Sequence, residues 1–141
     1  MTVNQILSKK GNEVYSIVST ITVYEAIKVM GEKNIGSVLI IEDTALKGVL
    51  SERDYARKIV LKNKASKDTL VKEIMDTDLV TVKPTDNIEY CMELMSEKRV
   101  RHLPVVDSGI VVGLVSMSDV VKAIIEIQKD TINYLNSYIS Q

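Results

Sequence analysis

An internal repeat at a fixed spacing of 65 residues limits what this chain can fold into more than any other feature of its sequence. Segment 48–54 reads Gly-Val-Leu-Ser-Glu-Arg-Asp, and segment 113–119 reads Gly-Leu-Val-Ser-Met-Ser-Asp. At the same spacing Thr20 matches Thr85, Met30 matches Met95, and apolar residues match apolar residues without a gap. A register that stays constant over most of each half indicates two copies of one structural unit.

The length of the chain suggests how the two copies are stabilised. A chain of 141 residues divides into halves of about 60 residues, each marginal alone, so we expect the halves to share a core. The composition is that of an ordinary globular protein, with 45% hydrophobic and 26% charged residues. The chain has no Phe and no Trp, which predicts an aliphatic core.

Charge and hydropathy argue against several classes of protein. The net charge is −1, and basic and acidic residues are scattered through both halves, which disfavours nucleic acid binding. The longest apolar run, residues 38–41, is too short to span a bilayer, and the first residues do not resemble a secretory signal. The only cysteine, Cys91, has no partner for an internal disulfide. These features predict a cytoplasmic location.

Each copy is predicted to form a small β-α-β-β-α unit of an α/β (α+β) fold. The predicted strands are residues 14–18, 37–42 and 46–50 in the first copy and 79–83, 102–107 and 110–115 in the second. Helices are predicted between Thr22 and Gly36, up to Arg99, and from Ser51 and Ser116 onward. Similar segments at 3–7 and 71–75 resemble a short leading helix. The predicted division is therefore 1–61 for the first unit, 62–70 for a linker, 71–127 for the second unit and 128–141 for an extension of the last helix.

The last helix carries apolar residues at alternating spacings of four and three. This seam consists of Val121, Ile125, Gln128, Ile132, Leu135 and Ile139. Such a pattern is typical of a coiled coil. Either the helix packs back on its own domain, or it pairs with its twin in a homodimer. The homodimer is favoured because the first copy has no counterpart of this tail.

The repeated Ser and Asp residues have two interpretations. Ser51 with Asp54, and Ser116 with Asp119, fit helix N-caps with an acidic partner in the first turn, which is common and purely structural. Alternatively, the free N–H groups of each helix could hold a phosphate, and the carboxylate could accept hydrogen bonds from both hydroxyls of a ribose. Capping explains each pair but not the recurrence of the whole frame around it, so the ligand interpretation is favoured.

The β-α-β-β-α repeat, the two Gly-x-x-Ser-x-x-Asp segments and the run Arg-His-Leu-Pro-Val-Val at 101–106 resemble a tandem pair of cystathionine β-synthase (CBS) domains, a Bateman module. The resemblance covers residue 3 to about residue 127. It implies two units packed sheet to sheet, with an extended C-terminal helix added here. It also implies two clefts for adenosine-containing ligands such as AMP, ADP, ATP or NAD, and dimerisation into a disc of four units.

The resemblance also implies roles for individual residues. The aspartates hold the ribose, the serines contact ribose or phosphate, and basic residues before the Leu-Pro-Val strand reach the phosphates. The predicted nucleotide-binding residues are Gly48, Ser51, Arg53, Asp54, Arg101, His102, Gly113, Ser116 and Asp119. The equivalents of Arg101 and His102 in the first copy are Gly36 and Ser37, and Arg53 has no basic counterpart, so the two clefts are predicted to be inequivalent.

Three functions remain open at this point. The first is a regulatory module that binds an adenosine nucleotide, forms a homodimer and relays energy or redox state to an unidentified protein. The second is a structural dimerisation scaffold whose Ser/Asp pairs only cap helices. The third, an enzyme, is weakest because no catalytic motif is present. No metal site, nucleic acid or membrane partner is predicted.

Overall fold

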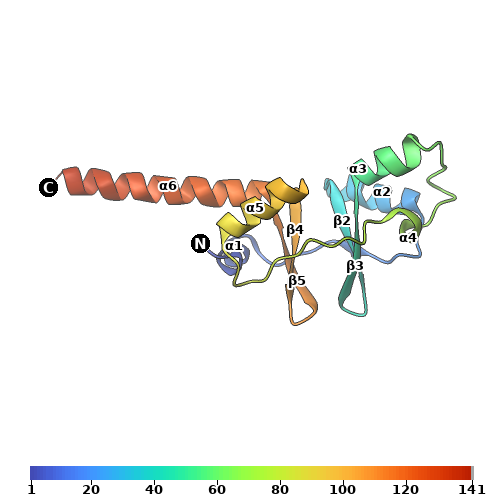
Figure 1. The fold of residues 1–141 in the computed structure, drawn as a ribbon, viewed down its shortest axis with the longest axis horizontal. Helices are drawn as coiled ribbons and strands as arrows, with labels where there is room; N and C mark the ends of the chain where they lie inside the picture. Colours follow the sequence, from blue (N-terminus) through green and yellow to red (C-terminus); the bar gives the residue numbers. More distant parts are fainter. Residues whose placement is uncertain (141) are drawn as a thin grey trace. The chain divides into compact units, whose positions relative to one another are not determined.

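The computed structural model describes residues 1–140, which form two compact units (Figure 1). One unit contains the first copy and comprises Glu13–Leu79 with Asp107–Val111. The other comprises Met1–Asn12, Val80–Val106 and the chain from Val112 onward. Each unit has its own cluster of buried apolar residues. The core shared between the halves stays a prediction. The predicted α/β (α+β) fold with a long last helix is confirmed.

The first-copy unit contains a three-stranded sheet in the order β1-β2-β3. The strands are β1 (Ser16–Ile17), β2 (Ser37–Glu42) and β3 (Ala45–Ser51), with β1 parallel and β3 antiparallel to β2. The helices are α2 (Val23–Lys33), α3 (Glu52–Tyr55), which continues into a π-helical turn at Ala56–Val60, and α4 (Val71–Ile74). The predicted β2 is confirmed residue for residue. Helix α2 ends at Asn34 in the left-handed region rather than at the predicted Gly36.

The second-copy unit contains α1 (Val3–Lys10), α5 (Ile88–Lys98), most of β4 (His102–Asp107) and β5 (Ile110–Ser116), and α6 (Met117–Ile139). The predicted strand at 79–83 is reduced to one parallel bridge between Val82 and Val105. Val82 donates to the carbonyl of Pro104 at 3.0 Å and accepts from Val106 at 2.8 Å. Because Pro84 and Pro104 have no backbone N–H, the ladder cannot extend as a regular strand would.

The leading helices pack on the opposite copies. Val3 of α1 donates to the carbonyl of Asp86 at 2.8 Å, whereas Val71 of α4 donates to the carbonyl of Ile21 at 2.9 Å. The sequence division groups residues 3–7 with the first copy, but in the structure α1 completes the core of the second-copy unit. A repeat shows which segments are alike, and it does not show which copy each leading helix covers.

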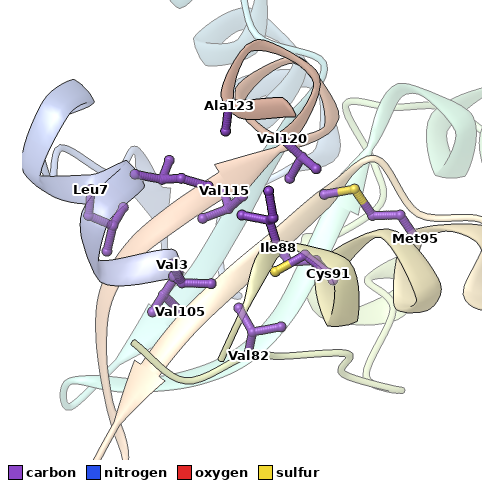
Figure 2. Packing of buried hydrophobic residues seen from close by; sticks show 12 residues of the cluster. Val3, Leu7, Val82, Ile88, Cys91, Met95, Val105, Val115, Val120 and Ala123 are labelled. Carbon is purple, nitrogen blue, oxygen red and sulfur yellow. The ribbon is translucent and has the colours of Figure 1, made fainter. Parts of the chain in front are cut away.

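The core of the second-copy unit is aliphatic, as predicted. Figure 2 shows this cluster, in which Val3 and Leu7 of α1 are joined by side chains of α5, β4, β5 and α6, namely Ile88, Cys91, Met95, Val105, Val115, Val120 and Ala123. Cys91 is fully buried, as predicted for a small apolar residue. Burial raises the pKa of its thiol to about 11, so the thiol stays protonated and unreactive at neutral pH.

The hairpin turns of the two copies differ at one position where conformation matters. The β2–β3 turn places Asp43 and Thr44 at φ of 52° and 66°, and the β4–β5 turn places Ser108 and Gly109 at 52° and 81°. Two consecutive positive φ values define the turn type that favours glycine. The second copy therefore has the preferred residue where the first has a β-branched one.

We expect Thr44→Gly to stabilise the protein by up to about 1 kcal/mol, because it relieves the left-handed conformation of a β-branched residue. The reciprocal Gly109→Thr should destabilise by about 1–2 kcal/mol. Urea denaturation of both variants measures these changes. A loss of stability in Thr44→Gly would contradict this account of the turn.

Helix α6 extends well beyond the core of its unit (Figure 1). Its last residues buried in that core are Val120 and Ala123. The predicted seam is exposed, from 45% at Ile125 to 78% at Ile139, so these seam residues are not buried against their own unit. Among the described residues, no helix combines the length and apolarity needed to cross a membrane.

Candidate functional site

Both predicted Ser/Asp pairs cap the helices that follow them. The backbone N–H of Ser116 donates to Asp119 Oδ2 at 2.8 Å, and the N–H of Asp119 donates to Ser116 Oγ at 3.1 Å. Ser51 and Asp54 make the same two bonds at 2.9 and 3.1 Å. The structural interpretation of the pairs is therefore correct. Whether they also bind a ligand depends on the groups around them.

The two glycines that begin these segments are required by packing. An added Cβ at Gly48 would lie 2.8 Å from Met75 Sδ and 3.1 Å from the carbonyl oxygen of Asp76. An added Cβ at Gly113 would lie 2.8 Å from both methyl carbons of Leu7. In each unit a residue of the leading helix, or just after it, lies against the glycine. Close packing thus explains why both copies have a glycine at this position, and no contact to a phosphate is needed to explain it.

We expect Gly48→Ala to destabilise the protein by about 1–3 kcal/mol, because the neighbouring Asp76 carbonyl belongs to the backbone and cannot rotate away. Gly31→Ala is the matched control. Gly31 lies within α2 with open space around its Cα, so alanine there should stabilise by up to about 1 kcal/mol. Urea denaturation compares the two variants. Equal stability of Gly48→Ala and the unmodified protein would contradict the packing role.

Asp119 also accepts a bond that capping does not require. Lys10, at the end of α1, donates from Nζ to Asp119 Oδ2 at 2.7 Å and to the Leu114 carbonyl at 2.9 Å. The Asp119 side chain is 17% exposed. Burial alone would raise its pKa, but the bonds from Lys10 and Ser116 outweigh burial and lower it. The carboxylate is therefore ionised at neutral pH and positioned to accept hydrogen bonds.

His102 and Arg101 lie at the same end of the unit. The N–H of Met117, the first residue of α6, donates to the Arg101 carbonyl at 2.8 Å, which fixes the start of β4 against the start of α6. Burial, together with the positive charges of Lys10 and Arg101, lowers the pKa of His102 despite the opposing effect of Asp119. The imidazole is thus neutral at pH 7 and can offer one N–H donor but no positive charge.

The equivalent site in the first copy is built differently. Lys58, one turn along the same helix, lies 3.2 Å from Asp54 Oδ1 and donates to the Ile74 carbonyl at 2.8 Å. Ser37, the counterpart of His102, pairs with Ser51 across the sheet. Ser37 is 7% exposed, and its Oγ has no hydrogen-bond partner among the described residues. Arg53 is exposed in the first turn of α3.

Comparison with known proteins identifies the family. The sequence model of the CBS domain matches this chain twice, at residues 3–61 and 71–126. The chain belongs to the CBS-domain family. It is a CBS pair, and the resemblance noted in its sequence is confirmed.

Three similar proteins place the pair more closely. The mitochondrial CBS domain-containing protein CBSX3 of Arabidopsis thaliana is 39% identical over 123 residues, which cover 84% of this chain and 60% of that protein's length. A CBS-domain protein of Burkholderia ambifaria MC40-6 has a structure 45% identical in sequence, with a TM-score of 0.85, covering 89% of this chain and 95% of the other.

The third is the CBS pair of protein MJ0100, solved in complex with 5′-methylthioadenosine and S-adenosylmethionine. It is 25% identical, with a TM-score of 0.77, and the match covers 88% of this chain and 95% of the other.

Within each unit of the CBS pair, the predicted residues lie on consecutive elements. His102 begins β4 and Arg101 directly precedes it, Gly113 and Ser116 lie on β5, and Asp119 lies in the first turn of α6. Gly48 and Ser51 lie on β3, and Arg53 and Asp54 lie in α3. Two lysines were missed, Lys10 and Lys58, and Ser37 was named only as the uncharged counterpart of His102. The spacing of four between Asp54 and Lys58 could have revealed that pair, because such residues face each other on a helix. Lys10 had no comparable signal.

Proposed function

We propose that this CBS pair is a regulatory module that binds adenosine-containing ligands such as AMP, ADP, ATP or NAD near Asp54 and Asp119. On this proposal the protein has no catalytic activity of its own. Ligand binding changes the conformation or assembly of the module, and a second protein responds to that change. The bound ligand thereby reports the energy or redox state of the cell to the second protein. A cytoplasmic location remains a prediction from composition.

The observation that carries the proposal is the placement of a lysine beside each capping aspartate. A helix cap needs only the serine and the backbone N–H groups, and both boxes are complete without a cation. Lys10 nevertheless lies 2.7 Å from Asp119, and Lys58 lies 3.2 Å from Asp54. The two lysines do not occupy equivalent positions in the repeat, because Lys10 belongs to α1 and Lys58 follows Asp54 by four residues. A carboxylate beside an ammonium group suits a nucleotide, which brings ribose hydroxyls and phosphates to the same place.

Ser37 supports the proposal in the first copy. The buried hydroxyl of Ser37 has no hydrogen-bond partner among the described residues, which is uncommon and costs free energy. A hydrogen bond from a ligand would remove this cost. Ser37 lies opposite Ser51 on the sheet, next to the Ser51–Asp54 box. The adenosine compounds bound by the CBS pair of MJ0100 support the same ligand class.

A thermal-shift panel with AMP, ADP, ATP, NAD and S-adenosylmethionine tests the proposal, with GMP and GTP as controls for the base. A ligand at 100 times its dissociation constant stabilises a fold by about 2.7 kcal/mol, which for a chain of this size raises Tm by several degrees. A shift with one or more adenine compounds supports the proposal. The absence of any shift at millimolar concentrations would contradict it.

A second candidate function, a dimerisation scaffold, is favoured by α6. Its five apolar seam residues, namely Val121, Ile125, Ile132, Leu135 and Ile139, are exposed in the single chain. A helix segment of this length is marginal in water without a partner. A second copy of this chain offers the same seam, so we propose that the protein is a homodimer. Dimerisation is compatible with the ligand-binding role and would be its only function if no ligand binds.

A further inference from the structure

The surface between α1 and α6 carries an assembly of lysines beside Asp119. A cavity of about 440 Å³ opens there, within the range of small-molecule sites. Apolar side chains, among them Ile6 and Ala123, form part of its lining. Its charged lining consists of four lysines against two carboxylates, namely Lys9, Lys10, Lys122 and Lys129 with Asp119 and Glu126. The predicted ribose-binding carboxylate thus lies on the wall of a cavity with excess positive charge.

The ion pairs of this cavity show which lysine a ligand would reach first. Lys9 pairs with Glu126 at 2.8 Å, but both side chains are more than half exposed, so this pair contributes little. Lys10 is 35% exposed and holds Asp119 Oδ2 at 2.7 Å. Ser116 and Lys10 both donate to Oδ2 of this carboxylate. A ribose held by the Asp119 carboxylate would therefore lie beside the Lys10 ammonium group, where the phosphates of a nucleotide begin.

We infer that Lys10 and the cavity between α1 and α6 form an anion subsite that binds the phosphates of a nucleotide whose ribose is held by Asp119. The inference rests on the proposed function, since it assigns the phosphate end of the same ligand. In the first copy, Asp54 pairs instead with Lys58, four residues along the same helix, and Lys58 also donates to the Ile74 carbonyl. The subsite selects for phosphorylated ligands, so the affinity increases from adenosine to AMP to ATP.

Calorimetric titration of the intact protein with adenosine, AMP and ATP tests the subsite. The variants are Lys10→Met, Lys10→Arg and the control Lys98→Met, at an exposed lysine of α5 outside the cavity lining. Loss of one charge-assisted contact is expected to weaken ATP binding at the Asp119 site about tenfold or more in Lys10→Met. Adenosine binding should change less than threefold, Lys10→Arg should retain most of the ATP affinity, and Lys98→Met should bind ATP as the unmodified protein does. Thermal unfolding without ligand confirms that each variant is folded.

The outcomes separate the subsite from the function on which it rests. If the unmodified protein binds ATP and adenosine equally, or if Lys10→Met binds ATP as tightly as before, the subsite is wrong and the nucleotide-binding function stands. If Lys10→Met weakens adenosine and ATP equally, Lys10 only supports Asp119, and the subsite is also wrong. If the unmodified protein binds none of the three, the proposed function fails and the subsite fails with it.

Discussion

Asp119→Asn is expected to weaken adenine nucleotide binding at the second-copy site by about 100-fold, since two hydrogen bonds to a charged acceptor are lost or weakened. Asparagine is nearly the same size, and its side-chain oxygen can still accept the Ser116 N–H that caps α6. The ion pair with Lys10 is partly exposed, so the free energy of unfolding without ligand should fall by about 1 kcal/mol or less. Calorimetry and urea denaturation measure the two quantities separately.

Asp86→Asn is the control for this prediction. Asp86 lies in the same unit and accepts a backbone N–H from Lys83 at 2.8 Å, but it belongs to neither Ser/Asp pair. This variant should bind nucleotide as the unmodified protein does. Asp54→Asn should affect only the first-copy site, which has no Arg101 and His102 counterparts. If Asp119→Asn reduced stability and left affinity unchanged, Asp119 would be a cap only, as the scaffold interpretation holds.

Ile132→Asp with Leu135→Asp is expected to convert the protein from a dimer to a monomer. Both residues belong to the seam of α6 and are 55% and 49% exposed in the single chain. In a paired seam they would be buried, and burying an unpaired carboxylate costs several kcal/mol, which raises the dimer dissociation constant more than about 100-fold. Sedimentation equilibrium of the unmodified and double-variant proteins measures this change.

Tyr134→Asp provides the matched control for the seam. Tyr134 lies between the two seam residues in sequence, is 71% exposed, and falls outside the four-and-three spacing. The charge introduced is the same, yet this variant should remain dimeric. Equal dissociation by the control and the seam variant would show that the effect arises from helix destabilisation. A monomeric unmodified protein would contradict the homodimer directly.

Local rules allowed the sequence to predict much of the fold. The continuous apolar run of β2 was placed correctly because a buried strand needs apolar residues on both faces. Ser51 and Ser116 were placed correctly at helix starts because capping depends only on residues within one turn. The glycines at 48 and 113 were recognised as important, but the reason for them was not. The atoms that crowd them come from α1 and from the residues just after α4, which are distant in the sequence.

Long-range packing determined the features that the sequence did not reveal. Lys10 and Asp119 are separated by 109 positions, and they meet only because α1 packs on the second copy. The repeat in the sequence does not show that α1 packs on the second copy and α4 on the first, because the two copies are similar and either could pack against either helix. The site at Asp119 therefore combines a local motif, which the sequence shows, with a lysine that only the tertiary structure supplies.

A calorimetric titration of adenine nucleotides into the unmodified protein and the Asp54→Asn, Asp119→Asn double variant tests the central proposal most directly. We predict saturable binding of at least one of AMP, ADP, ATP or NAD to the unmodified protein and no detectable binding to the folded double variant. Failure of the folded, unmodified protein to bind any of them, or equal binding by the double variant, would contradict the assignment of Asp54 and Asp119 as ligand-binding residues.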